Sequence, residues 1–267
     1  AFAIAAIFSG KTDLLMGARK GSPLVLGYGQ GEMFLGSDAI ALAPPPRDVT
    51  YLEEGDWVVL TPTSHDVRNA NGDRVNRPRV KSAVNEGLIE RGEYDHFMLK
   101  EIHEQPESLA RSILPYIDQA TQTLNLGDVA DTMFAKADRA VAIACGTAYY
   151  AAHTAKYWFE QKAKLAFETD IASEFRYREP VLPQTGPAMF VSQSGETADT
   201  LAALRYCRQN GTPAVAVVNV PESSIAREAA AIVPTYAGPE IGVASTKAFT
   251  AQLSVLAVLA LNAAKAR

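Results

Sequence analysis

The chain has 267 residues, of which 48% are hydrophobic and 21% charged, values typical of a soluble globular protein with room for two domains. Its net charge of −5 argues against a nucleic-acid partner, and no apolar run reaches the about 18 residues of a membrane span, so we expect no membrane segment. Cys145 and Cys207 have neither metal-ligand spacing nor the pattern of a secreted disulfide framework, which favours a reducing cytoplasm.

Residues 1–62 predict antiparallel β-structure, because short apolar segments alternate there with Gly-rich turns. The expected strands are Ala1–Phe8, Leu14–Ala18, Leu24–Tyr28, Glu32–Ser37 and Trp57–Thr61, with a short helix at Asp38–Leu42 and an extended loop at Ala43–Asp48. A unit of this size leaves strand edges unpaired, so we expect it to be part of a larger sandwich. The chain begins with Ala1 rather than Met, and we expect it to be a fragment or a processed product.

Residues 63–138 predict a connecting region. Residues 63–93 are polar, and Asn71-Gly72 is a strong turn signal, so we expect a hairpin followed by a linker. Apolar residues recur at helical spacing from Tyr94 to Ile117, and Pro106 is expected to end or kink that helix. Residues 118–138 are expected to form a second helix that leads to the next domain.

From residue 139 onward the chain alternates between strands and helices, which predicts an α/β fold with a parallel sheet between two helical layers. The expected strands are Ala140–Ala144, Leu165–Ile171, Ala188–Ser192, Ala214–Asn219 and Ala231–Tyr236. The expected helices are Thr147–Lys164, Ser173–Arg176, Thr197–Asn210, Ile225–Ala230 and Ser245–Lys265. The last helix is rich in Ala and Leu but is interrupted by polar residues, so we expect a core helix rather than a membrane helix.

The stretch from Ser192 to Thr197 carries three hydroxyls within six residues, at the carboxyl end of a predicted buried strand. Open α/β sheets bind ligands at this edge, and the N–H groups of the helix that begins there favour an anion. Gly195 lets a backbone approach a ligand closely. The stretch therefore predicts a site for a phosphate monoester that needs neither metal nor cofactor. The alternative is ordinary helix capping by Ser and Thr.

Three motifs carry a family resemblance: Cys145-Gly146-Thr147, Ser192-Gln193-Ser194-Gly195-Glu196-Thr197 and Glu240-Ile241-Gly242-Val243-Ala244-Ser245-Thr246-Lys247. Further matching words are Gly21–Leu24, Leu52–Asp56, Lys100–Pro106 and Glu174–Arg178. With them, nearly the whole chain in order resembles the family of glutamine–fructose-6-phosphate aminotransferases, also called glucosamine-6-phosphate synthases.

The resemblance implies three parts. Residues 1–62 correspond to the end of the glutaminase domain, a β-rich segment of the N-terminal-nucleophile type. Residues 63–129 correspond to a hairpin, a linker and connecting helices, and residues 130–267 to the first of two sugar isomerase (SIS) domains. The nucleophilic cysteine of the family and its second SIS domain, with the proton-moving Glu, the ring-opening His and the Schiff-base Lys, have no counterpart here. We therefore expect a cytoplasmic fragment without catalytic residues, which binds fructose 6-phosphate or glucosamine 6-phosphate and pairs as a homodimer through SIS domains.

The resemblance also assigns site residues. Ser192, Gln193, Ser194 and Thr197 would hold the phosphate, and Gly146, Thr147, Val243 and Ser245 would line the sugar. Position 148 departs from the family, which commonly has Ser after Cys-Gly-Thr where this chain has Ala148. One sugar contact worth about 1 kcal/mol is therefore in question.

Three further residues allow two interpretations each. Cys145 is a candidate nucleophile, but a Cys after a buried strand is more often an inert small hydrophobe. Lys247 is either a phosphate or Schiff-base lysine, or a solvated or ion-paired one. Glu196 is either a general base or a carboxylate that complements a helix dipole. We expect the structural interpretation in each case. For the four His residues, which lack ligand spacing, we expect no metal role.

A second functional class also fits a SIS domain, namely a non-catalytic sensor of sugar phosphates in a transcriptional regulator. Such regulators usually place a helix-turn-helix segment before the SIS domain. Here a β-rich segment stands in that place, without a basic recognition helix, so the enzyme interpretation is preferred.

Overall fold

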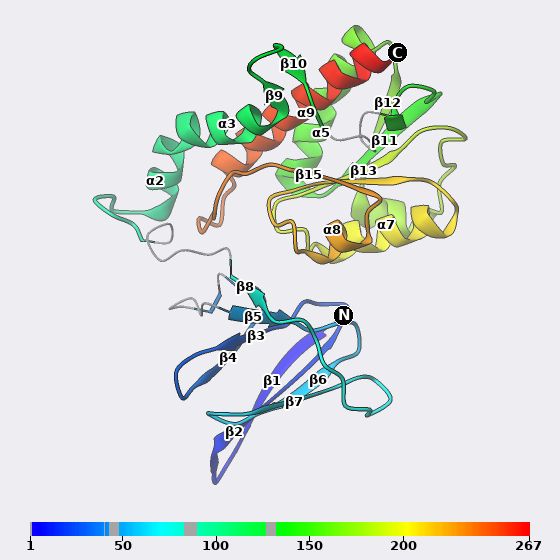
Figure 1. Ribbon diagram of the computed structural model, residues 1–267. Helices are drawn as coiled ribbons and strands as arrows, with labels where there is room; N and C mark the ends of the chain where they lie inside the picture. Colours follow the sequence, from blue (N-terminus) through cyan, green and yellow to red (C-terminus); the bar gives the residue numbers. More distant parts are fainter. Residues whose placement is uncertain (1, 40, 43–47, 83–89, 127–131) are drawn as a thin grey trace. The chain divides into compact units, whose positions relative to one another are not determined.

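The computed structural model describes residues 2–39, 41–42, 48–82, 90–126 and 132–267 (Figure 1). The chain forms two compact units, Ala1–Glu90 and Arg91–Arg267. Each unit has its own buried hydrophobic clusters.

The N-terminal unit contains two four-stranded antiparallel sheets. The first has the order β1 (Phe2–Phe8), β2 (Lys11–Lys20), β6 (Trp57–Leu60), β7 (His65–Arg68). The second has the order β4 (Met33–Gly36), β3 (Val25–Tyr28), β5 (Asp48–Tyr51), β8 (Val80–Lys81). The predicted antiparallel β-structure is therefore present, and its turns coincide with the Gly-rich breaks.

Two details of this unit were predicted wrongly. Residues 38, 39, 41 and 42 form bends rather than a helix, because the Asp38 carboxylate accepts the Ala41 N–H at 2.8 Å and closes a local turn. Strand β5 was not predicted at all. Strand β5 is defined by its pairing with β3, and its alternate residues Val49 and Tyr51 pack into the same hydrophobic cluster.

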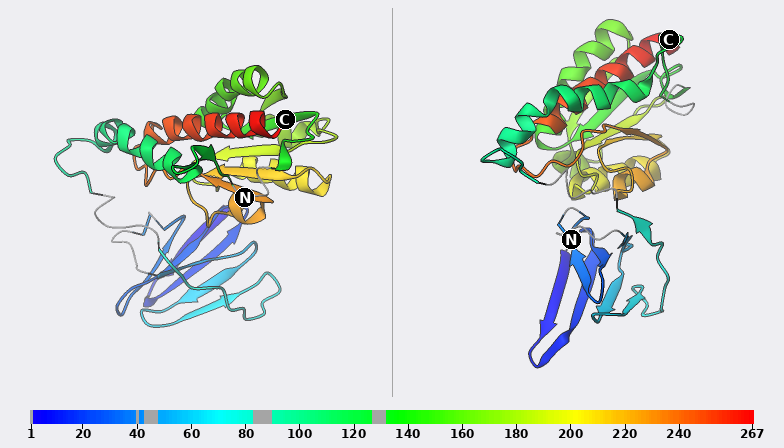
Figure 2. Two further views of the ribbon diagram at one scale, coloured as in Figure 1. Left: turned by 45° about the horizontal axis from the view of Figure 1, so that its top comes forward. Right: turned by 60° about the vertical axis from the view of Figure 1, so that its left-hand side comes forward.

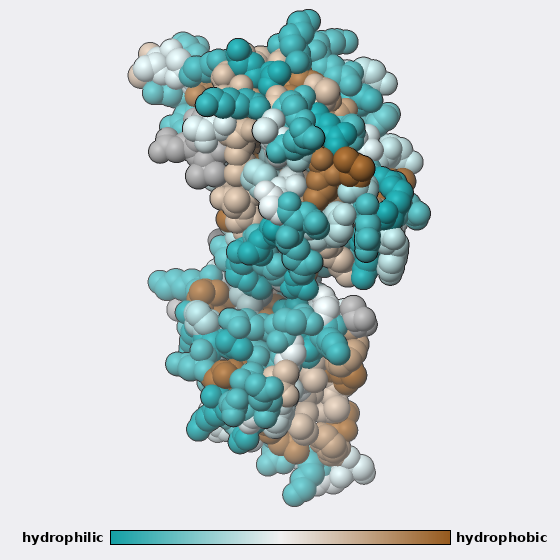
Figure 3. All heavy atoms as spheres, turned by 90° about the vertical axis from the view of Figure 1, so that its right-hand side faces the viewer, coloured by the Kyte–Doolittle hydropathy of each residue, from teal (hydrophilic) through white to brown (hydrophobic). Residues whose placement is uncertain are grey.

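Strand β1 lies at the edge of its sheet and exposes large apolar side chains on both faces. These are Phe2, Ile4, Ile7 and Phe8. Figure 3 shows hydrophobic residues gathered on one side of this unit. A sandwich larger than these residues stays a prediction, and an exposed apolar edge of this kind is the surface that it would cover.

The connecting region was predicted in part. A helical segment breaks at Glu104 into α2 (Phe97–His103) and α3 (Gln105–Ile113), as Pro106 in the first turn of α3 predicts, and a 3₁₀ turn (Leu114–Tyr116) follows. Residues 117–124 form a small hairpin of β9 (Ile117–Asp118) and β10 (Thr123–Leu124), so the start of the predicted second helix is wrong. The Asp118 carboxylate accepts the N–H groups of Ala120 and Thr121 and fixes this turn. Residues 127–131 of that predicted helix lie outside the described residues.

The C-terminal unit is built on five parallel strands in the order β12-β11-β13-β14-β15 (Figures 1 and 2). The strands are β11 (Arg139–Ala144), β12 (Ala166–Ile171), β13 (Ala188–Ser192), β14 (Ala214–Val218) and β15 (Ala231–Pro234). The helices are α5 (Gly146–Lys162), α6 (Ala172–Arg178), α7 (Ala198–Gln209), α8 (Ser224–Glu228) and α9 (Lys247–Ala266). All ten predicted elements are present, with ends within two residues of the prediction, and the three-layer α/β fold is confirmed.

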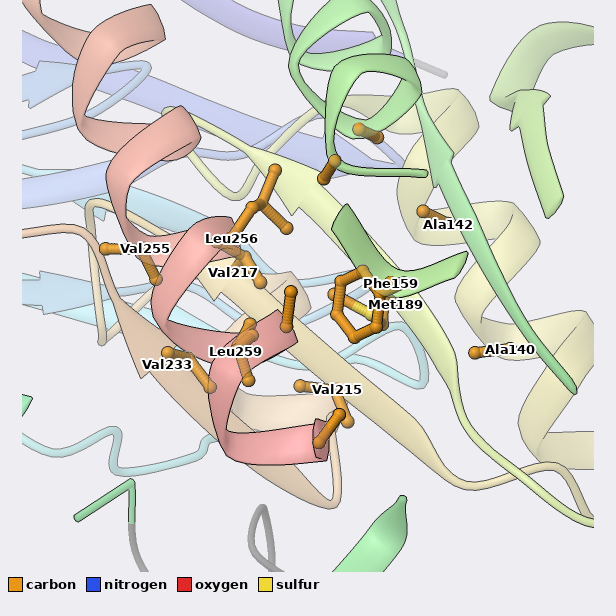
Figure 4. Close-up of a cluster of buried hydrophobic side chains, with 14 of the residues drawn as sticks. Ala140, Ala142, Phe159, Met189, Val215, Val217, Val233, Val255, Leu256 and Leu259 are labelled. Atoms are coloured by element: carbon orange, nitrogen blue, oxygen red, sulfur yellow. The ribbon is translucent and has the colours of Figure 1, made fainter. Parts of the chain in front are cut away.

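Alternate residues of the central strands β11, β13 and β14 enter different cores, which is why these strand sequences show no polar face. On one face, small residues such as Ala140 and Ala142 pack under α5 and α9 together with Met189 and Val215 (Figure 4). On the other face, Val141, Ile143 and Phe190 pack against α6, α7 and α8. Small side chains under α5 let that long helix lie close to the sheet, where its Phe159 stacks on Phe167 at 4.3 Å between ring centroids.

Helix α9 is long and apolar enough to cross a membrane by length and composition alone. Its residues Val255, Leu256 and Leu259 lie in the core, and 61% of the apolar window is buried inside the protein. Each buried Leu contributes about 1.5–3 kcal/mol to folding. The expectation of a core helix therefore holds.

Candidate functional site

A cavity of about 290 Å³ lies at the carboxyl ends of β11 and β13. These strands are neighbours, and the order of the sheet reverses between them because β12 lies on the outer side of β11 and β14 on the far side of β13. Ligands of open α/β sheets bind at this reversal point. The cavity is lined by Cys145, Thr147, Ala148, Val191, Ser192, Gln193, Ser194, Thr197, Glu240, Gly242, Val243, Ser245 and Gln252.

The structure brings seven of the eight predicted site residues to this cavity. The three hydroxyls of Ser192, Ser194 and Thr197 line it together with Gln193. Thr147, Val243 and Ser245 line it from other segments. Gly146 is the exception, because it opens α5 with a φ of +58° between two lining residues and is not itself part of the wall. The sequence motifs therefore predicted that these seven residues lie together, and ligand binding by them stays a proposal.

The segment Ser192–Thr197 is folded tightly by its own side chains. The Ser192 hydroxyl accepts the Gly195 N–H at 3.0 Å and lies 3.1 Å from the Thr197 hydroxyl. Gly195 has a φ of +65°, and a Cβ there would lie 1.9 Å from the Ser223 hydroxyl oxygen. The close approach that we expected Gly195 to allow to a ligand is thus made to the protein itself, and it fixes the shape of the loop.

Two helices begin at the cavity wall. Cys145 is the N-cap of α5 and Thr197 the N-cap of α7, and neither residue makes a side-chain capping hydrogen bond. N–H groups in the first turn of a helix lack intrahelical partners, and the helix dipole places partial positive charge there. Both helix ends therefore favour an anion in the cavity, without any Lys or Arg among the lining residues.

The third wall is the loop before α9, which a buried carboxylate from α2 holds in place. Glu101 is only 2% exposed, and its Oε1 accepts the N–H groups of Ile241 at 2.6 Å and Gly242 at 3.0 Å. Glu240 in the same loop accepts the Ala248 N–H at 3.0 Å and so caps α9. Sequence reasoning missed Glu101, because nothing in the local pattern links α2 to a loop about 140 residues away.

Lys247 is engaged with Glu104 rather than with the cavity. Its Nζ lies 2.5 Å from Glu104 Oε2, its side chain is 3% exposed, and it is absent from the cavity wall. Burial alone would raise the pKa of Glu104, but the hydrogen bond and charge of Lys247, with the charge of Lys100, hold that pKa below its usual value. The ion-paired interpretation of Lys247 is therefore the one that the structure shows.

The other candidate residues, Glu196 and the two cysteines, have different surroundings. Glu196 accepts the Ser224 N–H at 2.7 Å at the start of α8, so its carboxylate serves a neighbouring helix. Cys145 lines the cavity and is partly exposed, whereas Cys207 is buried, and burial raises the pKa of its thiol to about 12. Within the described ranges no three His, Cys, Asp or Glu side chains come together as metal ligands.

Comparison with known proteins shows the family of the C-terminal unit and two similar full-length proteins. Residues 133–262 match the model of the SIS domain family, and the C-terminal unit is a SIS domain. The chain is 55% identical over its full length to glutamine–fructose-6-phosphate aminotransferase [isomerizing] of Bradyrhizobium diazoefficiens and 56% identical to that of Brucella abortus. The resemblance predicted from the motifs is confirmed. The chain spans 44% of the length of these relatives.

A solved structure leads to the same class. The C-terminal domain of glucosamine-fructose-6-phosphate aminotransferase from Francisella tularensis matches with a TM-score of 0.64 and 45% identity, over 66% of this chain and 50% of that one. At this identity the likeness covers sequence as well as fold.

Proposed function

We propose that this chain is the sugar-phosphate-binding part of a glutamine–fructose-6-phosphate aminotransferase. In the whole protein, the reaction would make glucosamine 6-phosphate from fructose 6-phosphate and glutamine. The observation that carries the proposal is the cavity at the reversal point of the sheet, where neutral hydroxyls and two uncapped helix N-termini converge. The names of the relatives and of the structural neighbour support the choice of ligand.

The phosphate would lie against the hydroxyls of Ser192, Ser194 and Thr197, with Gln193 beside them. At about 1.5–3 kcal/mol for each charge-assisted hydrogen bond, these donors and the N–H groups of α7 hold a dianion without a cationic side chain. The sugar would extend toward Thr147, Val243 and Ser245, with Gly146 setting the turn that presents Thr147.

The proposal includes the division of the chain. Residues 1–62 would be the end of a glutaminase domain, residues 63–129 a connecting region and residues 130–267 the first SIS domain. The groups that move protons and form the Schiff base would come from elsewhere in the whole protein, so this chain alone binds sugar phosphate and catalyses nothing. Pairing as a homodimer in the cytoplasm through SIS domains belongs to the same proposal.

Isothermal titration calorimetry of the 267-residue chain with fructose 6-phosphate and glucosamine 6-phosphate tests the binding half of this proposal. An assay for glucosamine 6-phosphate formed from fructose 6-phosphate and ammonia tests the other half. We expect weak binding of both sugars and no turnover. No binding to either sugar contradicts the first half, and measurable turnover contradicts the second.

A further inference from the structure

We propose that Glu240 is a specificity-determining residue of the cavity, whose carboxylate pairs with a protonated amino group on the sugar and so favours an amino sugar phosphate over a neutral one. This inference rests on the proposed function and deepens it, because it distinguishes between the two sugar phosphates named there. The group that Glu240 would recognise is the amine and not the phosphate.

The Glu240 carboxylate lies in the cavity wall and is held there through one of its two oxygens. Its Oε1 accepts the Thr246 N–H at 2.8 Å, the Thr246 hydroxyl at 3.3 Å and the Ala248 N–H at 3.0 Å. Within the described part of the chain, Oε2 takes part in no hydrogen bond or ion pair. The residue is partly exposed, and Oε2 is not one of the buried side-chain atoms that lack a partner. Oε2 is therefore an accessible acceptor in a fixed position.

The charge of this carboxylate is not balanced by a neighbouring cation among the described residues. Of the described residues that line the cavity, Glu240 is the only Asp, Glu, Lys or Arg. Lys247 follows closely in sequence, but its Nζ is paired with Glu104 and it is absent from the cavity wall. The cavity thus presents one anionic group that a cation on a ligand can neutralise.

Capping of α9 does not explain why this residue is charged. Neutral Ser, Thr and Asn side chains cap helices about as well as a carboxylate does. A carboxylate beside a bound phosphate dianion repels it, so for a ligand with only a phosphate and neutral hydroxyls Glu240 would weaken binding. A ligand that carries a cation as well as the phosphate turns the same charge into an attraction. The protonated amine of an amino sugar phosphate is such a cation.

The two charged groups of this ligand would meet different walls of the cavity. The phosphate would lie against the donors of the segment Ser192–Thr197, which follows β13. Glu240 belongs to the loop before α9, as do Val243 and Ser245, which the proposed function assigns to the sugar. The carboxylate is therefore on the side of the cavity where the amine of the sugar is expected.

Glu240→Gln separates the charge from the capping role, because its amide oxygen can still accept the N–H groups of Thr246 and Ala248. Wild type should bind glucosamine 6-phosphate about tenfold more tightly than glucose 6-phosphate, which has a hydroxyl in place of the amine. In the variant, affinity for glucosamine 6-phosphate should fall about tenfold, while affinity for glucose 6-phosphate should stay within about twofold. A carboxylate with only a structural role does not produce this difference between the two ligands.

Asp118→Asn is the matched control, because it removes the same charge from the same unit of the chain. Asp118 Oδ1 accepts the N–H groups of Ala120 at 2.9 Å and Thr121 at 3.2 Å, and Asp118 is not part of the cavity wall. This substitution should leave the ratio of the two affinities at its wild-type value.

The experiment is calorimetric titration of wild type and both variants with glucosamine 6-phosphate, glucose 6-phosphate and fructose 6-phosphate. A pH of about 6.5 lies above the usual pKa of a Glu carboxyl group and below that of an amine, so both partners are charged. A loss in Glu240→Gln that is confined to glucosamine 6-phosphate supports the proposal. An equal loss for all three ligands, an unchanged preference in that variant, or a wild type without the preference overturns the proposal while the proposed function stands.

No binding of any of the three sugar phosphates by the wild type overturns the proposed function and this inference with it. If Glu240→Gln does not fold, the wild type alone provides a test. Raising the NaCl concentration from about 50 mM to about 500 mM should reduce its preference for glucosamine 6-phosphate at least about threefold, because salt screens the pair of charges. A preference that does not change with salt overturns the proposal.

Discussion

Removing the Glu101 carboxylate should free one wall of the cavity without unfolding the domain. Glu101 Oε1 accepts two N–H groups, from Ile241 and Gly242, and hydrogen bonds to a charged group contribute about 1.5–3 kcal/mol each. At the lower value, Glu101→Ala lowers the free energy of local opening of this loop by about 3 kcal/mol. Because about 1.4 kcal/mol is a factor of ten, exchange of these two amide protons should accelerate about 100-fold.

Native-state hydrogen exchange, resolved by residue with NMR, measures this effect directly. Affinity for glucosamine 6-phosphate should fall with it, by about tenfold, because Val243 and Ser245 belong to the freed loop. Glu101→Gln keeps one oxygen for both N–H groups and should restore most of the protection, which a general packing role for Glu101 does not predict.

The control is Glu107→Ala on α3, which removes an exposed carboxylate paired with Arg111 and should change neither exchange at the loop nor binding. The reasoning is refuted if the amides of Ile241 and Gly242 exchange at the wild-type rate in Glu101→Ala.

Three further predictions concern the cavity and its surroundings. Ser194→Ala should weaken binding of glucosamine 6-phosphate at least tenfold in calorimetry, because it removes a charge-assisted hydrogen bond, whereas Lys247→Ala should change it far less; the reverse ranking would place the phosphate elsewhere. The lowered pKa of Glu104 stabilises the fold above its unfolded pKa, near 4.5, and this contribution is lost as the pH falls through the lower folded pKa. Denaturant titrations should therefore show less loss of stability on acidification in Glu104→Gln, and identical pH profiles would contradict the assignment. Cys145 should react with a thiol reagent at pH 8, and glucosamine 6-phosphate should slow this reaction. Cys207, with a pKa of about 12, should react only on unfolding. Equal rates at Cys145 with and without the sugar would show that the ligand lies away from it.

The alternation of strands and helices after residue 139 was predictable because the three central strands, β11, β13 and β14, are covered on both faces. The run Ala188–Ser192 contains no polar face and leads through small polar residues to the helix that begins at Ala198. The same logic located the cavity, since the carboxyl ends of adjacent parallel strands meet at one edge.

The failures have two causes, which are dependence on residues far away in sequence and local turns closed by a single Asp side chain. Strand β5 follows a Pro-rich segment and is defined by its partners β3 and β8. The hairpin at residues 117–124 depends on a single Asp turn that helical periodicity does not reveal. Glu101 reaches the loop before α9 from a helix whose local sequence indicates only a buried face. Its role follows from these tertiary contacts and cannot be read from a motif.

A crystal structure of the chain with glucosamine 6-phosphate tests the central claim most directly. We predict phosphate oxygens within hydrogen-bonding distance of the hydroxyls of Ser192, Ser194 and Thr197, at the N-terminus of α7. A phosphate bound elsewhere on the domain, or a cavity that stays closed to the sugar at saturating concentration, would contradict the account.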